Sequence, residues 1–210
     1  MFSGLQNEIY TMFLVSITIL AVLNPFGNLT QFIAMADDLE AVKRQHLFRN
    51  ILYTAFIIVV IFLYSGPFLM KYVFNISLDD LRIAGGLILV VMATKNLLFP
   101  EAKKDALAVQ DLSESELLRK SVIPMAFPML VGPGTLSTVI VVSEDSGVMT
   151  ASGAVLFAFI FMFVLFHFAA TIERLVGKLI LHIFSRIAQV FIMAIGVKMM
   201  VIGIKDLFAA

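Results

Sequence analysis

The sequence contains no cysteine, only three histidines and few charged residues. The lack of cysteine excludes disulfides and thiolate metal sites, and no His-Glu-x-x-His pattern offers a metal site of another kind. Charged residues make up 14% of the 210 residues, whereas a soluble domain usually carries about 25%. The formal net charge is zero, so the composition does not point to nucleic acid as a partner.

Patterns typical of enzymes are also missing. The glycine-rich segment Gly132-Pro133-Gly134-Thr135 is not followed by the Lys-Ser/Thr of a phosphate-binding loop. Ser65, Ser152 and His167 are not spaced like any known nucleophile and base. We therefore expect no enzymatic activity, no cofactor and no bound metal.

Long apolar stretches dominate the chain. Hydrophobic residues make up 60% of the sequence, and the mean hydropathy is +1.00. A membrane-spanning helix needs roughly 20 apolar residues, and a β-barrel would instead show short alternating strands. The first stretch lacks the basic start of a signal peptide and is too long for one, so we expect it to be retained. We predict an all-α, polytopic membrane protein with six spans, at residues 9–36, 50–70, 81–99, 121–143, 146–172 and 186–208.

The distribution of lysine and arginine predicts an orientation. Ten of the 15 basic residues lie in or beside the loops that follow the first, third and fifth spans, whereas Lys71, Arg82 and Lys205 lie on the other side. Because basic residues concentrate in cytoplasmic loops, both termini are expected to face away from the cytoplasm. The polar segment 100–120 would then be a cytoplasmic linker.

The two halves of the chain resemble each other. Gly27-Asn28-Leu29-Thr30 follows Pro25 much as Gly134-Thr135-Leu136-Ser137 follows Pro133, and Arg82-Ile83-Ala84 matches Arg186-Ile187-Ala188 at a similar offset. We predict two three-span repeats, 1–99 and 121–210, joined by the linker 100–120 into one membrane domain. An odd number of spans makes the second repeat enter the membrane inverted, as in many secondary transporters.

The strongest candidate site lies where proline and glycine interrupt the first and fourth spans. We predict that these helices are broken or re-entrant, and that each break starts a half-helix whose unpaired N–H groups attract an anionic group such as a carboxylate. The alternative is that proline and glycine only kink packed helices, with hydroxyl groups repairing the backbone. The predicted substrate-binding residues are Asn24, Pro25, Gly27, Asn28, Thr30, Gln31, Gly132, Pro133, Gly134, Thr135, Ser137 and Thr138.

Four basic residues in or at the ends of spans are candidates for gating or charge recognition. Lys95 and Lys198 lie within spans, where a lysine either faces the protein interior or extends to the membrane surface. Arg82 and Arg186 begin their spans and fit an anchoring role at the interface. No Asp or Glu lies deep in a span, so a coupling ion would need backbone carbonyls and Thr, Ser or Asn oxygens.

The motifs Asn24-Pro25-Phe26-Gly27-Asn28, Arg82-Ile83-Ala84-Gly85-Gly86 and Pro128-x-x-Val131-Gly132-Pro133-Gly134 resemble the MarC family of bacterial and archaeal membrane proteins. The resemblance covers nearly the whole chain. It implies a six-span protein of the cytoplasmic (inner) membrane, distantly similar to the LysE exporter group. One family label derives from a multiple-antibiotic-resistance locus, and another assigns transport of small neutral amino acids such as glycine and alanine.

Together these observations predict a secondary transporter of small neutral amino acids or similarly small metabolites, working by alternating access. A channel or exporter for other small solutes, and a non-transporting accessory protein, are the alternatives. The expected partners are a small zwitterionic solute, a coupling ion, the lipid bilayer and further copies of the chain in a homo-oligomer. The sequence leaves open the substrate, the direction of transport, the ion and the oligomeric state.

Overall fold

The computed structural model describes residues 2–36, 39–98 and 114–209, and these residues form helices and no strands. The predicted linker 100–120 falls mostly outside this part of the chain. In chain order the elements are α1 (Phe2–Leu23), α2 (Pro25–Met35), α3 (Ala41–Phe68), η1 (Leu69–Val73), α4 (Leu78–Leu98), α5 (Glu114–Lys120), η2 (Ser121–Leu130), α6 (Pro133–Ser146), α7 (Val148–His167), α8 (Ala169–Val176) and α9 (Lys178–Ala209).

The helices have the length and composition of membrane spans. Five helical stretches are long and apolar enough to cross a bilayer: Glu8–Met35, Ala41–Val73, Leu78–Leu98, Val148–His167 and Leu179–Ala209. The pair Leu118–Leu130 and Pro133–Ser146 is bent by 62° at its break and gives a sixth span if it is counted as one. Large apolar side chains are exposed on the outside of these helices, as lipid contact requires. The prediction of an all-helical polytopic membrane protein is confirmed.

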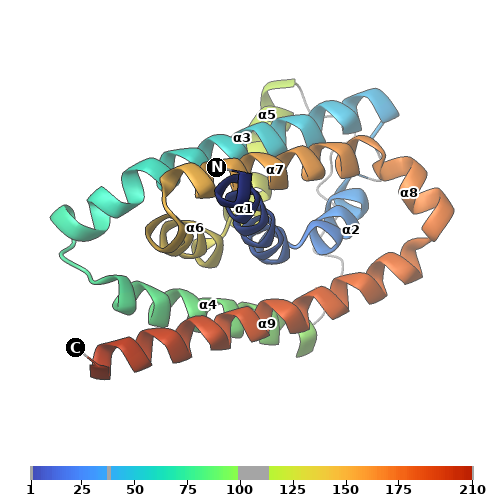
Figure 1. The fold of residues 1–210 in the computed structure, drawn as a ribbon. Helices are drawn as coiled ribbons and strands as arrows, with labels where there is room; N and C mark the ends of the chain where they lie inside the picture. The colour runs from blue at the N-terminus through green and yellow to red at the C-terminus, as the bar shows by residue number, and fades with distance from the viewer. Residues whose placement is uncertain (1, 37–38, 99–113, 210) are drawn as a thin grey trace.

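The spans form three layers (Figure 1). Helices α3 and α7 run side by side along one face, α4 and α9 along the opposite face, and α1, α2 and α6 lie between them. Aromatic contacts hold α3 to α7: the ring centroids of Tyr53 and Phe163 are 5.0 Å apart, and those of Phe56 and Phe159 are 5.2 Å apart. This arrangement encloses the interrupted helices within protein, where irregular backbone is tolerated.

Helices α4 and α9 meet through their backbones. A Cβ atom added at Gly196 would lie 2.7 Å from the carbonyl oxygen of Gly86, and one added at Gly86 would overlap the carbonyl oxygen of Gly196. Gly85 faces the side chain of Ser137 on α6 equally closely. The Gly85-Gly86 pair therefore lets α4 pack closely against α6 on one face and against α9 on the other.

Contacts between the two halves follow a reciprocal pattern. Helix α1 contacts α7, and η2 contacts α3; likewise α2 contacts α9, and α6 contacts α4. Helices α4 and α9 run antiparallel, since Asn96 lies near Arg186 whereas Arg82 lies near Asp206. An inverted repeat would produce such matching pairs of contacts between the halves. The repeat itself and its boundaries remain predictions.

The fourth span is more irregular than expected. Ile123 and Phe127 adopt extended backbone angles inside η2, with φ/ψ of −129°/122° and −131°/128°. Each of them precedes a proline, and the proline ring disfavours helical geometry in the preceding residue. The span expected at 121–143 is broken as predicted, with a bend of 62° before Pro133, and the part before the break is irregular whereas α6 after it is a regular helix.

Candidate functional site

The first break is centred on Asn24. This residue lies between α1 and α2 with φ 47° and ψ 63°, a left-handed conformation that asparagine tolerates better than most residues. Its side-chain Oδ1 accepts a hydrogen bond from the N–H of Gly27 at 3.2 Å. Gly27 is required there because a Cβ would overlap the Asn24 side chain. The Asn28 Nδ2 donates to the carbonyl of Leu23 at 2.6 Å and so repairs the other side of the break.

The prediction of unpaired amides at this break is therefore wrong in part. The N–H of Gly27 is capped by the Asn24 side chain, and the N–H of Asn28 donates to the Asn24 carbonyl at 3.0 Å. An asparagine in the N-cap position satisfies these donors, as is usual for helix starts. The first break thus leaves neither the Gly27 N–H nor the Asn28 N–H open to a ligand.

The second break leaves its amides open. Gly132 occupies the N-cap position of α6 in an extended conformation, with φ −90° and ψ 176°, and makes no side-chain hydrogen bond. Pro133 follows at the first helical position, where its missing N–H is not needed. Within the described residues, the N–H groups of Gly134 and Thr135 have no acceptor. This helix start carries the partial positive charge that attracts anions.

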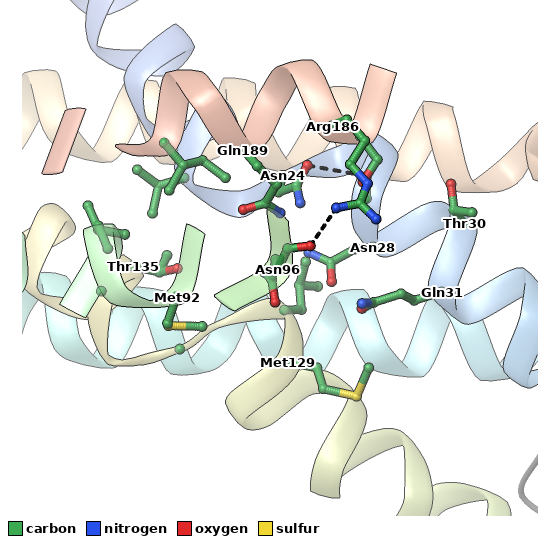
Figure 2. Close-up of a pocket in the computed structure, with 18 of the residues that line it drawn as sticks. Asn24, Asn28, Thr30, Gln31, Met92, Asn96, Met129, Thr135, Arg186 and Gln189 are labelled. Atoms are coloured by element: carbon green, nitrogen blue, oxygen red, sulfur yellow. Dashed lines mark hydrogen bonds between the residues drawn. The ribbon is translucent and has the colours of Figure 1, made fainter. Parts of the chain in front are cut away.

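A pocket of about 240 Å³ lies where the two breaks approach each other (Figure 2). It is smaller than the roughly 300–1,000 Å³ of drug-sized ligand pockets and holds on the order of eight waters. A small solute therefore fits its size. The lining residues come from α1, α2, α4, α6, η2, α9 and the breaks: Val22, Asn24, Gly27, Asn28, Thr30, Gln31, Ala34, Leu89, Met92, Asn96, Met129, Leu130, Gly132, Gly134, Thr135, His182, Ser185, Arg186, Gln189 and Ile192.

Most of the predicted substrate-binding residues line this pocket. From the first break these are Asn24, Gly27, Asn28, Thr30 and Gln31, and from the second Gly132, Gly134 and Thr135. The structure thus brings together two segments that are far apart in the sequence. Their role in binding a substrate remains a prediction.

Four predicted residues do not line the pocket. Pro25 and Pro133 start α2 and α6. Ser137 Oγ donates to the carbonyls of Pro133 and Gly134, each at 3.1 Å, and Thr138 Oγ1 donates to Gly134 at 2.7 Å. Such bonds to the preceding turn are common for hydroxyl side chains in helices, and here they stabilise the first turn of α6.

Sequence analysis missed the contribution of α4 and α9. Asn96 on α4 and His182, Ser185 and Gln189 on α9 line the pocket but were not predicted. Gln189 is only 5% exposed although it lies in an apolar span. The sequence did contain a signal for these residues. A polar side chain inside an apolar span is unfavourable in lipid, so it is expected to face the protein interior or a cavity. Whether the polar residues of α4 and those of α9 face the same cavity depends on how these two helices pair.

The four candidate basic residues occupy different places. Lys95 and Lys198 are exposed on the outside of the bundle and line no described pocket. Arg186 lines the pocket, where its Nη1 donates to the carbonyls of Asn96 at 2.8 Å and Leu97 at 2.7 Å, near the end of α4. Arg82 lies at the other end of α4. Of the four, Arg186 is the one that the structure places at the candidate site.

Arg82 connects three helices at the end opposite Arg186. Its Nη1 lies 2.7 Å from Asp79 Oδ1 on α4 and 3.1 Å from Asp206 Oδ2 on α9, and its Nη2 pairs with Asp145 on α6. Nearby, Lys71 pairs with Glu144 at 2.8 Å. The lining residues of the pocket come from the other halves of α4 and α9, so this ionic cluster closes the bundle on the side away from the pocket.

Replacing Arg82 by glutamine is expected to destabilise the fold. Three carboxylates would remain without their common cation, and we expect the free energy of unfolding to fall by roughly 1–3 kcal/mol. Thermal unfolding of the purified protein in detergent would measure this. Lys71→Gln is the matched control, because it breaks a single exposed ion pair and should have a smaller effect. Equal shifts for the two variants would contradict the central role of Arg82.

Replacing Asn24 tests the first break. Asn24→Ala removes the cap and places alanine in the left-handed region, which alanine adopts less readily than asparagine. The free energy of unfolding should therefore fall by about 1–2 kcal/mol. Asn24→Gly also removes the cap but tolerates the backbone, so its effect should be smaller. Asn75 has a similar φ of 51° and is exposed, and Asn75→Ala therefore isolates the backbone term. An unfolding temperature that is lower for Asn24→Gly than for Asn24→Ala would contradict this account.

The fold and the pocket define a polytopic, all-helical membrane protein in which two interrupted spans face a common polar cavity. The profile described as MarC family integral membrane protein matches residues 9–208, and the chain belongs to this family. It is similar to the UPF0056 membrane protein YvbG of Bacillus subtilis (strain 168), with 31% identity over 92% of this chain and 94% of the relative. It is also similar to the UPF0056 membrane protein YhcE of Escherichia coli (strain K12), with 31% identity over 91% of each chain. No solved structure matches the chain.

Proposed function

We propose that this protein is a secondary transporter of small neutral amino acids or similarly small metabolites. The observation that carries the proposal is the polar pocket of about 240 Å³ at the meeting point of two helix breaks. Broken helices that border a midplane cavity are typical of secondary transporters, because their ends offer backbone and side-chain groups to a solute. A packed structural protein has no need for such a cavity.

The chemistry of the lining suits a zwitterion. Arg186 and the start of α6 favour a carboxylate, and the amide oxygens of Asn28 and Asn96 are acceptors for an ammonium group. The lining is otherwise made mostly of small or apolar side chains, which fits a small substituent such as hydrogen or methyl.

The unequal ends of the bundle support alternating access. On one side the ionic cluster around Arg82 ties α4, α6 and α9 together, whereas the pocket lies toward the Arg186 side. With the predicted orientation, the Arg186 side faces the cytoplasm. The reciprocal contacts between the halves fit a mechanism in which one inverted repeat moves against the other.

Counterflow in proteoliposomes tests the proposal. Vesicles preloaded with unlabelled glycine or alanine should transiently accumulate the labelled solute, and uptake should saturate with concentration. A channel would give uptake that neither saturates nor shows counterflow. An accessory protein would give no flux above empty vesicles, and none of these solutes would raise its thermal stability.

A further inference from the structure

Two polar side chains of the pocket, Gln189 and Thr135, have no hydrogen-bond partner within the described part of the chain. Gln189 is 5% exposed and Thr135 is 4% exposed, and both line the pocket. Their polar atoms are not sealed inside the protein, because both residues line the pocket, and polar groups in such a position normally bind water or a ligand. Both groups are therefore available to a solute.

Arg186 brings a positive charge that the described residues do not neutralise. Its Nη1 is held by the carbonyls of Asn96 and Leu97, and its Nε lies 3.3 Å from His182 Nε2. No ion pair to Arg186 exists in the described part of the chain, and no Asp or Glu is among the pocket residues. The carbonyls fix the guanidinium but leave the N–H groups of Nη2 free. An arginine held in this way is suited to bind a carboxylate.

Gln189 lies beside Arg186 on the same face of α9. Residues three positions apart are neighbours on a helix surface, so the guanidinium and the carboxamide can contact one ligand group together. Figure 2 shows both residues at the cavity, with Thr135 on a separate side of it. The pocket thus has the guanidinium of Arg186 on its α9 side, and the Thr135 hydroxyl with the open N–H groups at the start of α6 on another side.

We infer that the solute must carry a carboxylate, which Arg186 and Gln189 bind, and that an amino group is dispensable. The inference rests on the proposed transport function and specifies its substrate class as small carboxylates. The Thr135 hydroxyl and the amide oxygens of Asn28 and Asn96 accept a hydrogen bond from a second polar group of the solute, either amino or hydroxyl, whereas the open N–H groups of α6 donate only to an oxygen. Because the pocket residues include one arginine and no acid, a solute with only a positive charge is excluded.

Four two-carbon solutes separate these requirements. Glycine and glycolate both have a carboxylate, whereas glycinamide and ethanolamine do not. We expect glycine and glycolate to stabilise the purified wild-type protein against thermal unfolding and to compete for flux in proteoliposomes, with glycinamide and ethanolamine weaker by at least about tenfold. Arg186→Gln should lose the distinction between glycine and glycinamide, and Arg186→Lys should keep part of it. Arg174→Gln is the control, because Arg174 is exposed on α8 outside the pocket and should behave as wild type.

The outcomes separate this inference from the proposed function. Flux of glycinamide equal to that of glycine would overturn the carboxylate requirement and leave transport intact. Stabilisation by glycolate that depends on Arg186, without flux of any solute, would support the carboxylate site and contradict transport. No stabilisation by either carboxylate overturns the inference. The wild-type comparison decides the carboxylate requirement even if Arg186→Gln fails to fold, and Arg186→Lys then tests the role of Arg186.

Discussion

Leucine in place of Thr135 or Asn28 is expected to abolish solute flux while the protein still inserts and folds. Both positions line the pocket and are buried, with 4% and 6% of the residue exposed. A leucine at either position would occupy part of the cavity and remove polar groups that face the solute. We expect counterflow of glycine or alanine to fall by at least about tenfold, which corresponds to a loss of roughly 1.4 kcal/mol of interaction.

The two positions serve as controls for each other. The Thr135 side chain makes no hydrogen bond within the described protein, so its replacement breaks no internal contact. Asn28 bonds the Leu23 carbonyl, and its replacement also weakens the break. Thr18→Leu is a matched exchange on α1 that lies outside the pocket and should leave flux unchanged. Normal flux in both pocket variants, at normal expression in the membrane, would rule out this site.

A bulkier residue at Gly86 or Gly196 should produce the largest loss of stability. Each glycine faces the backbone carbonyl of the other, and backbone cannot move aside as a flexible side chain can. Alanine at either position should destabilise the protein by about 1–3 kcal/mol, and leucine by more, because α4 and α9 must separate. Thermal unfolding in detergent or lipid nanodiscs would measure the effect.

Gly153 offers the control for this experiment. A Cβ at Gly153 would meet the end of the flexible Met12 side chain at 2.5 Å, and this side chain can turn away at little energetic cost. Gly153→Ala should therefore have a much smaller effect than Gly86→Ala. If all three alanine variants unfold at the same temperature, the contact between α4 and α9 does not limit stability.

The parts of the fold that depend on local chemistry could be predicted from the sequence. Long runs without charged residues predict the spans. Proline and glycine around Pro25 and Pro133 predict the breaks, because these residues act on the backbone of their own helix. The irregularity of η2 was missed, although Pro124 and Pro128 signal it. The number of spans and the presence of two interruptions needed no knowledge of tertiary contacts.

The parts of the site that depend on tertiary contacts could not be predicted in the same way. Whether Asn24 caps its own break or faces a solute is decided by its left-handed backbone, which the sequence permits but does not require. Gln189 and Asn96 reach the pocket only because α4 and α9 pair in one particular register. Ser137 and Thr138 follow the same pattern of residue types as Thr135, yet they bond to their own helix.

The contact between Gly86 and Gly196 has a mechanical consequence. It lies between the Arg82 cluster, which joins α4 to α9 at one end, and the Arg186 contact with Asn96 and Leu97, which joins them at the other. A Cβ added at Gly203 on α9 would lie 2.8 Å from the carbonyl oxygen of Asp79, so the two backbones are also in close contact at the Arg82 end. At the Arg186 end a side chain bonded to carbonyls joins the two helices, and these bonds can break without moving either backbone contact. We expect the two glycine contacts to stay fixed while the attachment of Arg186 to the end of α4 breaks and forms.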